Sequence, residues 1–522
     1  MYKINQVTLP IDFDKDNLNI FVAKKLGVDE SAITNAKPNK LSIDARDKNN
    51  LCYKASIIFD MNCKLDKKKL KNVEVYTEEQ FPKLIWNKGN KNIIIVGAGP
   101  SGLFAGLALS EAGAKVTILE RGFEMSKRKC AVDRMMNDGA LSTTSNIQFG
   151  EGGAGTFSDG KLNTGIKSPH IRKVLQDFVR FGANENILYD ARPHIGTDIL
   201  SDVIVNMRKQ IESLGGEFLF EHKLININFD NAMNVSSIDI ETPNGVIAMP
   251  CDVLILAIGH SSRDTMRMLF DKNMMLRQKP FSMGFRIEHR QEDINKAQYG
   301  ESDKANKLPP ADYHIVEHIG DRVVYSFCMC PGGVVVPAMS EEGTIVTNGM
   351  SYNARDKENA NSALLVGVNL SDFPSEHPLS GIELQEKYER YAYLKTNSYS
   401  ATVQRVGDYL SSQPTTKLGR VTPSYKPCVI LGSVEDMLPK FIVESIKSAI
   451  PKIGAKIKGF DDPDAILTGV ETRSSAPYQV VRDENMMSNL YGVYAIGEGA
   501  GFAGGIMSSA IEGLKCAITL CK

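Results

Sequence analysis

Several common signals are missing from this sequence of 522 residues, and each absence excludes a class of protein. No apolar stretch is long enough to span a bilayer, and the first residues lack the apolar core of a secretory signal. We therefore expect neither a membrane protein nor a secreted one. The formal net charge is only −1, which gives no bulk attraction to nucleic acid or to an anionic membrane.

Cysteine occurs nine times, an odd number without a CxxC pair or the spacing of a disulfide framework. This usage indicates reduced thiols and a cytoplasmic location. The sequence also contains no metal-ligand cluster, no nucleophile elbow and no Walker loop. We expect no bound metal, and the sequence assigns no catalytic residue.

The most informative feature that is present is an apolar run at residues 93–96, which predicts a strand buried on both faces, as in a parallel sheet. Gly97, Gly99 and Gly102 follow it: the first allows a tight turn, the second lets backbone approach a pyrophosphate, and the third lets a helix pack on the strand. The helix directs its N-terminal amides at that pyrophosphate. Glu120 ends the second strand, where an acid accepts ribose hydroxyls. The pattern predicts dinucleotide binding.

Two later strands complete this pattern. One buried strand ends at Gly259, and another near the C-terminus ends at Gly497 and Glu498. A carboxylate at such a strand end accepts hydrogen bonds from a polyhydroxy chain. A glycine-rich turn then leads into a helix that begins near Ile506, and its N-terminus places amides beside an electron-rich ring edge. Either piece alone also fits a purely structural strand–turn–helix.

Together these residues show a resemblance. The turn GAGPSG with Glu120, and the two later strand ends, resemble flavoproteins whose FAD-binding domain is of the glutathione-reductase type. Four blocks spread over the chain resemble, more narrowly, a family of uncharacterised bacterial FAD-dependent dehydrogenases: residues 41–46, 149–161, 326–333 and 497–507. The resemblance implies an oxidoreductase with FAD as cofactor, but it supplies no substrate.

The resemblance also implies a set of cofactor-binding residues. The pyrophosphate would lie at the first turn, the adenosine ribose at Glu120, the ribityl chain at Glu498 and the flavin pyrimidine edge at residues 505–507. Ile258 stands where the family's motif usually has Thr, and Glu498 where it more often has Asp; both changes keep the backbone geometry. The expected residues are Gly97, Gly99, Pro100, Ser101, Gly102, Glu120, Arg121, Gly153, Thr156, Gly259, Gly497, Glu498, Gly505, Ile506 and Met507.

The glycine-rich loop at residues 149–161 has two interpretations. A nest of backbone amides beside phosphate or flavin is the one we favour, and a surface loop with unusual dihedral angles is the other. His194, His260 and Arg473 lie in loops near the predicted cofactor segments. Each could donate a proton or clamp a substrate anion, but ordinary loop hydrogen bonding is the interpretation we favour for each.

Cys328 and Cys330 fall on one face of a predicted strand, because side chains there repeat every two residues. They could form a redox pair. Neighbours on one strand face are usually too far apart for an unstrained disulfide, so we favour two buried thiols.

The predicted fold class is α/β: a discontinuous Rossmann domain of glutathione-reductase type, an inserted α+β substrate domain and a small N-terminal α+β module. The module spans residues 1–88, the FAD-binding domain spans 89–279 and 463–522, and the substrate domain spans 280–462. Further expectations are strands at 323–329 and 334–338, helices at 381–396 and 434–450, and a helix capped by Thr197. The lysine-rich stretch at 64–71 suits either a nucleic-acid patch or a solvated face, which we favour.

Three functional hypotheses follow. The leading one is an FAD-dependent dehydrogenase that transfers hydride or electrons between FAD and an unidentified small organic substrate, with NAD(P)H as a candidate donor. The second is a flavoprotein that modifies or binds RNA through the N-terminal module, although the neutral charge argues against a nucleic-acid partner. The third is a non-catalytic FAD-binding scaffold.

Overall fold

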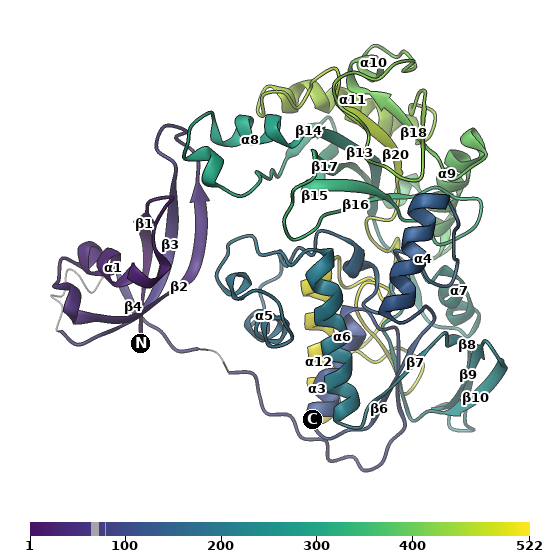
Figure 1. Ribbon diagram of the computed structural model, residues 1–522. Helices are drawn as coiled ribbons and strands as arrows, with labels where there is room; N and C mark the ends of the chain where they lie inside the picture. Colours follow the sequence, from purple (N-terminus) through teal and green to yellow (C-terminus); the bar gives the residue numbers. More distant parts are fainter. Residues whose placement is uncertain (64–71, 79) are drawn as a thin grey trace.

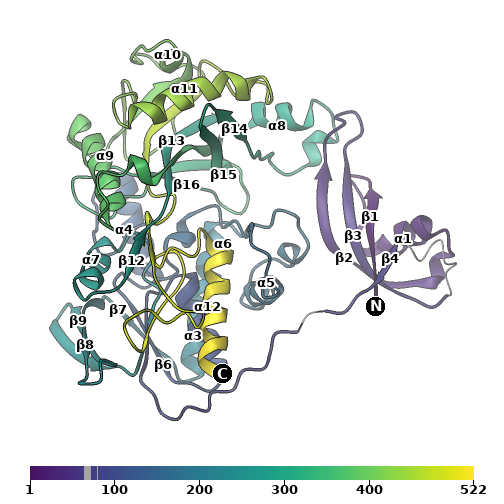
Figure 2. The same ribbon diagram turned by 180° about the vertical axis from the view of Figure 1, so that it is seen from behind.

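The computed structural model describes residues 1–63, 72–78 and 80–522, so the predicted lysine-rich stretch at 64–71 lies outside the described residues. Figure 1 shows an N-terminal module beside a larger body, in which a nucleotide-binding part lies below a cap. A long connection joins the module to the first strand of the body, and Figure 2 shows the same separation from behind.

The module is the expected small α+β unit. Helix α1 (Leu18–Leu26) packs on a four-stranded sheet and ends at Gly27, whose φ of 62° is the left-handed conformation favoured at helix ends. The sheet order is β2-β3-β1-β4, formed by β1 (Tyr2–Leu9), β2 (Ile33–Asp44), β3 (Cys52–Met61) and β4 (Val73–Val75). The module contacts the body at Leu41, whose amide donates to the Tyr189 carbonyl oxygen at 2.7 Å.

A five-stranded parallel sheet forms the nucleotide-binding part, in the order β22-β11-β5-β6-β7. Its strands come from two distant stretches of the chain: β5 (Ile93–Val96), β6 (Val116–Glu120), β7 (Glu217–Phe220), β11 (Val253–Leu256) and β22 (Val493–Ala495). As predicted, β5 is buried on both faces. Ile93 and Ile95 contact the helical layer, whereas Ile94 and Val96 contact the opposite layer.

Helices cover one face of this sheet and a small antiparallel sheet covers the other (Figure 1). The helical layer contains α3 (Pro100–Glu111), α5 (Ile171–Arg180), α6 (Thr197–Ser213) and α12 (Ile506–Cys521). The opposite layer contains β8 (Lys223–Phe229), β9 (Val235–Thr242), β10 (Gly245–Pro250) and α7 (Arg263–Asp271). Helix α4 (Met125–Asp138) follows β6.

The cap is built on a large mixed sheet with α11 (Lys440–Gly454) packed across it. Its main strand order is β14-β15-β17-β13-β20-β18-β19, and β16 pairs with β15. The strands are β13 (Phe281–Arg290), β14 (Val316–Ile319), β15 (Arg322–Pro337), β16 (Thr347–Met350), β17 (Asn359–Val368), β18 (Ala401–Arg405), β19 (Val429–Leu431) and β20 (Ile466–Glu471). The other cap helices are α8 (Gln291–Tyr299), α9 (Ser380–Thr396) and α10 (Val406–Leu410). A separate two-stranded ladder pairs β12 (Leu276–Gln278) with β21 (Tyr478–Val480).

Four expectations need correction. The boundary at 462 is too early, because β20 pairs with β13 and β18 inside the cap sheet. The strands expected at 323–329 and 334–338 are one long strand, and the helix expected at 434–450 begins at Lys440. Thr197 does not cap its helix: the N-cap is Gly196, and the Thr197 hydroxyl donates to the Thr156 carbonyl oxygen at 2.6 Å.

No helix in the described ranges, up to residue 63, 72–78 and from 80 onward, is long and apolar enough to cross a membrane.

Candidate cofactor site

A cavity of about 1620 Å³, open mouth included, lies between the nucleotide-binding part and the cap. It lies at the carboxyl ends of β5, β6 and β11, which is where open α/β sheets bind ligands. Residues of the cap form its opposite wall. The predicted cofactor residues line this cavity with four exceptions: Gly102, Thr156, Gly497 and Met507.

The three glycines of the first turn serve two different purposes. Gly97 has a φ of 107°, and a Cβ atom there would overlap the Ala257 carbonyl oxygen. A Cβ atom on Gly102 would overlap the Gly97 carbonyl oxygen, because α3 packs closely on the turn. Around Gly99, the nearest atom to an added Cβ is the Gly153 Cα at 3.8 Å, an ordinary contact. Packing therefore requires the first and third glycines, whereas the second leaves room beside the cavity.

Glu120 lines the cavity, and its carboxylate also accepts hydrogen bonds from the protein backbone. Its carboxylate accepts hydrogen bonds from the amides of Ala98 at 3.0 Å, Gly122 at 2.9 Å and Gly150 at 2.9 Å. The side chain is buried. A carboxylate has about four acceptor positions, so one is left for a ligand hydroxyl. Glu120 thus fixes three loops and retains the capacity to bind a ribose.

Arg121 is held at the same end of the cavity. Its guanidinium lies 4.5 Å from the centre of the Phe149 ring and donates to Asp264 at 2.9 Å and to Thr265 at 2.9 Å. Burial raises the pKa of Asp264, but Arg121 and Lys223 outweigh it and lower that pKa to about 2. Arg121 is therefore a positioned cation whose charge is already balanced within the protein.

The loop at 149–161 does not form the predicted amide nest at its start. The amides of Gly150, Glu151, Gly152 and Gly153 donate to Glu120, Phe123, Ala98 and Gly150, respectively. An added Cβ on Gly153 would lie 2.9 Å from the Gly99 Cα. The glycines instead let this loop pack directly against the first turn. Thr156, a residue of this loop, is fully buried, and its hydroxyl oxygen makes no hydrogen bond to the residues described.

Arg128 binds the backbone of the loop at residues 146–151, and the sequence did not predict this role. It is fully buried, and its guanidinium donates to the carbonyl oxygens of Asn146 at 3.0 Å, Ile147 at 3.0 Å and Glu151 at 2.6 Å. Burial lowers its pKa to about 10. No local pattern marks this arginine, because all its acceptors are backbone atoms at least 18 residues away.

The residues that follow β22 form the other end of the cavity. The carboxylate of Glu498 lies 3.3 Å from His260 Nδ1, and the buried His260 Nε2 makes no hydrogen bond to any described residue. Gly504 and Gly505 line the cavity at the start of α12, and a Cβ atom on either would meet nothing within 4 Å. A Cβ atom on Gly497 would instead overlap the Ser101 hydroxyl. The open glycines and the unpartnered imidazole nitrogen both leave room for a polar ligand.

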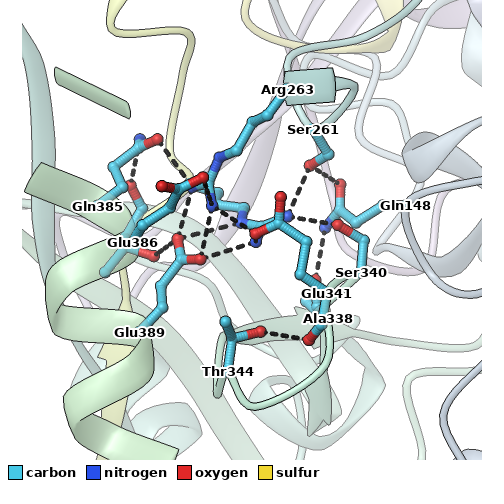
Figure 3. Close-up of polar contacts among 12 residues, drawn as sticks. Gln148, Ser261, Arg263, Ala338, Ser340, Glu341, Thr344, Gln385, Glu386 and Glu389 are labelled. Atoms are coloured by element: carbon cyan, nitrogen blue, oxygen red, sulfur yellow. Dashed lines mark hydrogen bonds and ion pairs between the residues drawn. The ribbon is translucent and has the colours of Figure 1, made fainter. Parts of the chain in front are cut away.

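A buried ionic network joins the two parts of the body beside the cavity. Figure 3 shows Glu389 of α9 facing Arg263 of α7, with Ser261 and Gln148 on the other side. Glu389 accepts from Arg263 at 2.8 Å and from Arg473 at 2.7 Å. Burial raises the pKa of Glu389, but the two arginines hold it well below its ordinary value.

Arg473 and His260 line the cavity, whereas His194 does not. The guanidinium of Arg473 also donates to Ser261 at 3.3 Å and to Ser340 at 2.6 Å, so it is engaged within the network. The anion clamp considered for Arg473 is not what the structure provides. His194 lies beside Lys161, and its Nε2 is 3.3 Å from the Asn353 carbonyl oxygen.

The residues of the cavity fit a dinucleotide with a polyhydroxy linker. Carboxylates stand at both ends, at Glu120 and Glu498, and the open glycine Gly99 lies at the start of α3. The N-termini of α3 and α12 carry the positive ends of their helix dipoles. The unpartnered His260 Nε2 offers one more polar contact.

Comparisons with known proteins agree with this geometry. Residues 90–132 match an FAD binding domain, residues 280–474 match the family described as "FAD-dependent protein, C-terminal domain-like", and residues 1–59 match a domain of unknown function. An uncharacterised protein of Clostridium beijerinckii is 44% identical over 526 residues, covering 99% of this chain and 97% of that protein.

The solved structures to which the chain is similar are more distant. A geranylgeranyl bacteriochlorophyll reductase-like protein of Thermoplasma acidophilum is 11% identical, with a TM-score of 0.37 over 82% of this chain and 78% of that one. CtdE in complex with FAD is 12% identical, with a TM-score of 0.33 over 82% and 84% of the two chains. With its full-length relative and its two FAD-related regions, the chain belongs to a family of uncharacterised FAD-dependent oxidoreductases, enzymes that use FAD as cofactor.

Proposed function

We propose that the protein is a dehydrogenase that transfers a hydride or electrons between bound FAD and a small organic substrate. One observation carries the proposal. Gly99 and Gly505 stand at the starts of two helices and line the same cavity, yet no protein atom near either one requires a glycine. A bound cofactor that approaches both backbones explains why side chains are missing at both positions.

In this proposal the pyrophosphate lies against Gly99 and the N-terminus of α3, the adenosine ribose is bound by Glu120, and the ribityl chain is bound by Glu498. The flavin ring lies near the start of α12. The proposed architecture is the discontinuous glutathione-reductase type, since β22 and α12 return to the sheet that β5 begins.

FAD, when bound, supplies the two-electron chemistry, and the protein binds, orients and shields the reactants. Cap residues Cys328, Asn348 and Ser474 line the cavity, so they are positioned to cover a substrate. The network of Arg263, Glu389 and Arg473 fixes this wall to the nucleotide-binding part. Separating its charges would leave Glu389 buried and unpaired, which costs several kcal/mol.

The test begins with the full-length protein as purified. We expect a yellow protein that releases FAD, not FMN, on acid treatment. The FAD-loaded protein is then mixed anaerobically with NADH, NADPH and a panel of metabolites, and the flavin absorption band is followed. A bleached band with one donor supports the proposal; a protein that cannot be loaded with FAD, or whose flavin no donor reduces, contradicts it.

A further inference from the structure

Two cysteines meet at a distortion of β15 beside the cofactor cavity. The pairing of β15 with β17 shifts register between Phe327 and Cys330. Cys328 lies in this shift with a φ of 44°, a left-handed conformation that is uncommon for residues other than glycine. Cys328 lines the cavity, whereas Cys330 is fully buried, with its sulfur 3.2 Å from the Cys328 carbonyl oxygen.

The distortion changes the distance argument made from the sequence. In a regular strand, these two side chains would point the same way but stand too far apart for an unstrained disulfide. Here the Cys330 thiol donates a hydrogen bond to the Cys328 carbonyl oxygen at 3.2 Å, and it has the largest effect of any group on the pKa of the Cys328 thiol. The distortion therefore holds the Cys330 thiol against Cys328, and Cys328 lines the cavity.

The surroundings of Cys328 are cationic. The Lys161 ammonium group lines the cavity, pairs with Asp159 at 3.2 Å and makes no hydrogen bond to any residue the structure describes. Arg286 is fully buried and donates to the Cys328 carbonyl oxygen at 2.8 Å. It also forms a bidentate pair with Glu471, at 2.7 and 2.9 Å.

The two thiols consequently differ. The hydrogen bond from Cys330, followed by the charges of Lys161 and Arg286, lowers the pKa of Cys328 to about 5, against burial and Asp159. The same hydrogen bond, together with burial, raises the pKa of Cys330 well above its ordinary value. Glu471 also faces this group, but Arg286 balances its charge. An accessible thiolate next to a buried thiol is the arrangement of an attacking and a resolving cysteine.

We propose that Cys328 and Cys330 form a second redox centre of this enzyme, a dithiol that closes to a disulfide beside the flavin. The inference rests on the proposed function in that FAD must occupy the cavity. On closure, the Cys328 thiolate and the Cys330 thiol form one S–S bond, and the S–H bond of Cys330 breaks. Two electrons and the Cys330 proton pass to the oxidised flavin, which balances the step.

The experiment counts reducing equivalents in the FAD-loaded, full-length protein. The protein is oxidised with ferricyanide, freed of oxidant and titrated anaerobically with dithionite. Wild type should consume two electrons per FAD for the flavin and two more for the disulfide. Cys330→Ser should consume only the two flavin electrons, whereas Cys516→Ser, a buried cysteine of α12 outside the cavity, should behave as wild type.

Mass spectrometry gives a readout that does not depend on the flavin. In oxidised protein, N-ethylmaleimide should fail to label Cys328 and Cys330, and a peptide that holds their disulfide should appear. Wild type that takes up only the flavin electrons and is labelled at Cys328 would overturn the redox centre. Absence of FAD after acid release would instead overturn the proposed function, so the two failures are distinct.

A second measurement tests the thiolate. The rate of Cys328 alkylation by iodoacetamide should rise with a midpoint near pH 5 in the full-length protein. Lys161→Met should move that midpoint upward by about one pH unit or more, since it removes the cation that lowers the pKa of Cys328 most, and Lys161→Arg should restore it. An unchanged midpoint in Lys161→Met would show that Lys161 does not stabilise the thiolate.

Discussion

Strand β5 passes into α3 through a turn whose glycines at 97 and 102 are surrounded by protein, whereas β22 passes into α12 through a longer turn that ends at the open Gly504 and Gly505. In the first unit, packing needs glycine at both ends, and only Gly99 between them is open toward the cavity. In the last unit, the packed glycines come first: a Cβ atom on Gly497 would overlap the Ser101 hydroxyl, and one on Gly501 would lie 2.5 Å from the Tyr478 carbonyl oxygen.

Glycines in two similar motifs are therefore required for different reasons. A packed glycine is required because a side chain would overlap neighbouring protein atoms, so its replacement should destabilise the protein with or without cofactor. At an open glycine a side chain would occupy only the space of the ligand, so its replacement should affect FAD binding alone. Substitutions in the two units can therefore separate folding from cofactor binding.

The largest effect is expected for Gly97→Val. The valine residue would need a positive φ of 107°, and its side chain would overlap the Ala257 carbonyl oxygen. Strain and overpacking together should lower the free energy of unfolding by about 2–5 kcal/mol, and FAD binding should be lost. Chemical denaturation of the cofactor-free protein measures this loss. Wild-type stability in this variant would show that the turn is not packed as described.

Glu120→Ala should affect both properties. Removal of the carboxylate leaves the amides of Ala98, Gly122 and Gly150 without their acceptor. At about 1 kcal/mol for each amide, the lower end of the range for an unsatisfied buried group, the free energy of unfolding should fall by about 3 kcal/mol. FAD affinity should fall about tenfold or more, because a charged acceptor for the ribose is lost. Calorimetry and fluorescence titration check the two parts; unchanged FAD affinity in the folded variant would assign Glu120 to loop fixation alone.

Gly99→Val is the matched control for Gly97→Val, two residues away. Its backbone φ of −79° and ψ of −179° suit valine, and the added Cβ has an ordinary contact. The cofactor-free protein should keep the wild-type unfolding midpoint, whereas FAD affinity should fall about a hundredfold, which is about 2.7 kcal/mol. Retained affinity in this variant would place the pyrophosphate elsewhere.

Gly505→Ala should give a smaller and purely ligand-dependent effect. Nothing lies within 4 Å of the added Cβ, and the extended backbone at this position suits any residue. We expect wild-type stability and a loss of FAD affinity of about tenfold or less, or about 1.4 kcal/mol, measured by the same titration. A destabilised cofactor-free variant would mean that the two units do not differ as described.

The smallest effect on FAD binding is expected when the N-terminal module is removed. Deletion of residues 1–76 leaves Phe81, Leu84 and Trp86, which pack against the nucleotide-binding core. None of the residues that line the cavity precedes Val96, so FAD affinity should stay within about twofold of wild type. A truncated protein that is folded by circular dichroism but does not bind FAD would assign the module to the cofactor site.

The sequence by itself determined the local units of this protein. The apolar run at 93–96, its glycines and Glu120 predicted β5, the turn and the end of β6 correctly, because their signals lie within about 30 residues of one another. The α+β class of the N-terminal module was predicted for the same reason: side-chain periodicity is a local property. The end of β22 and the start of α12 followed from the same kind of pattern.

Only the tertiary structure decided which residues meet. Arg128, Arg286 and Glu389 have partners on distant segments, and no local period marks a buried charge. The sequence likewise placed β20 in the wrong domain, because a buried strand can pair in either sheet. The contact of the Cys330 thiol with Cys328 depends on a register shift against β17, which regular strand geometry does not predict.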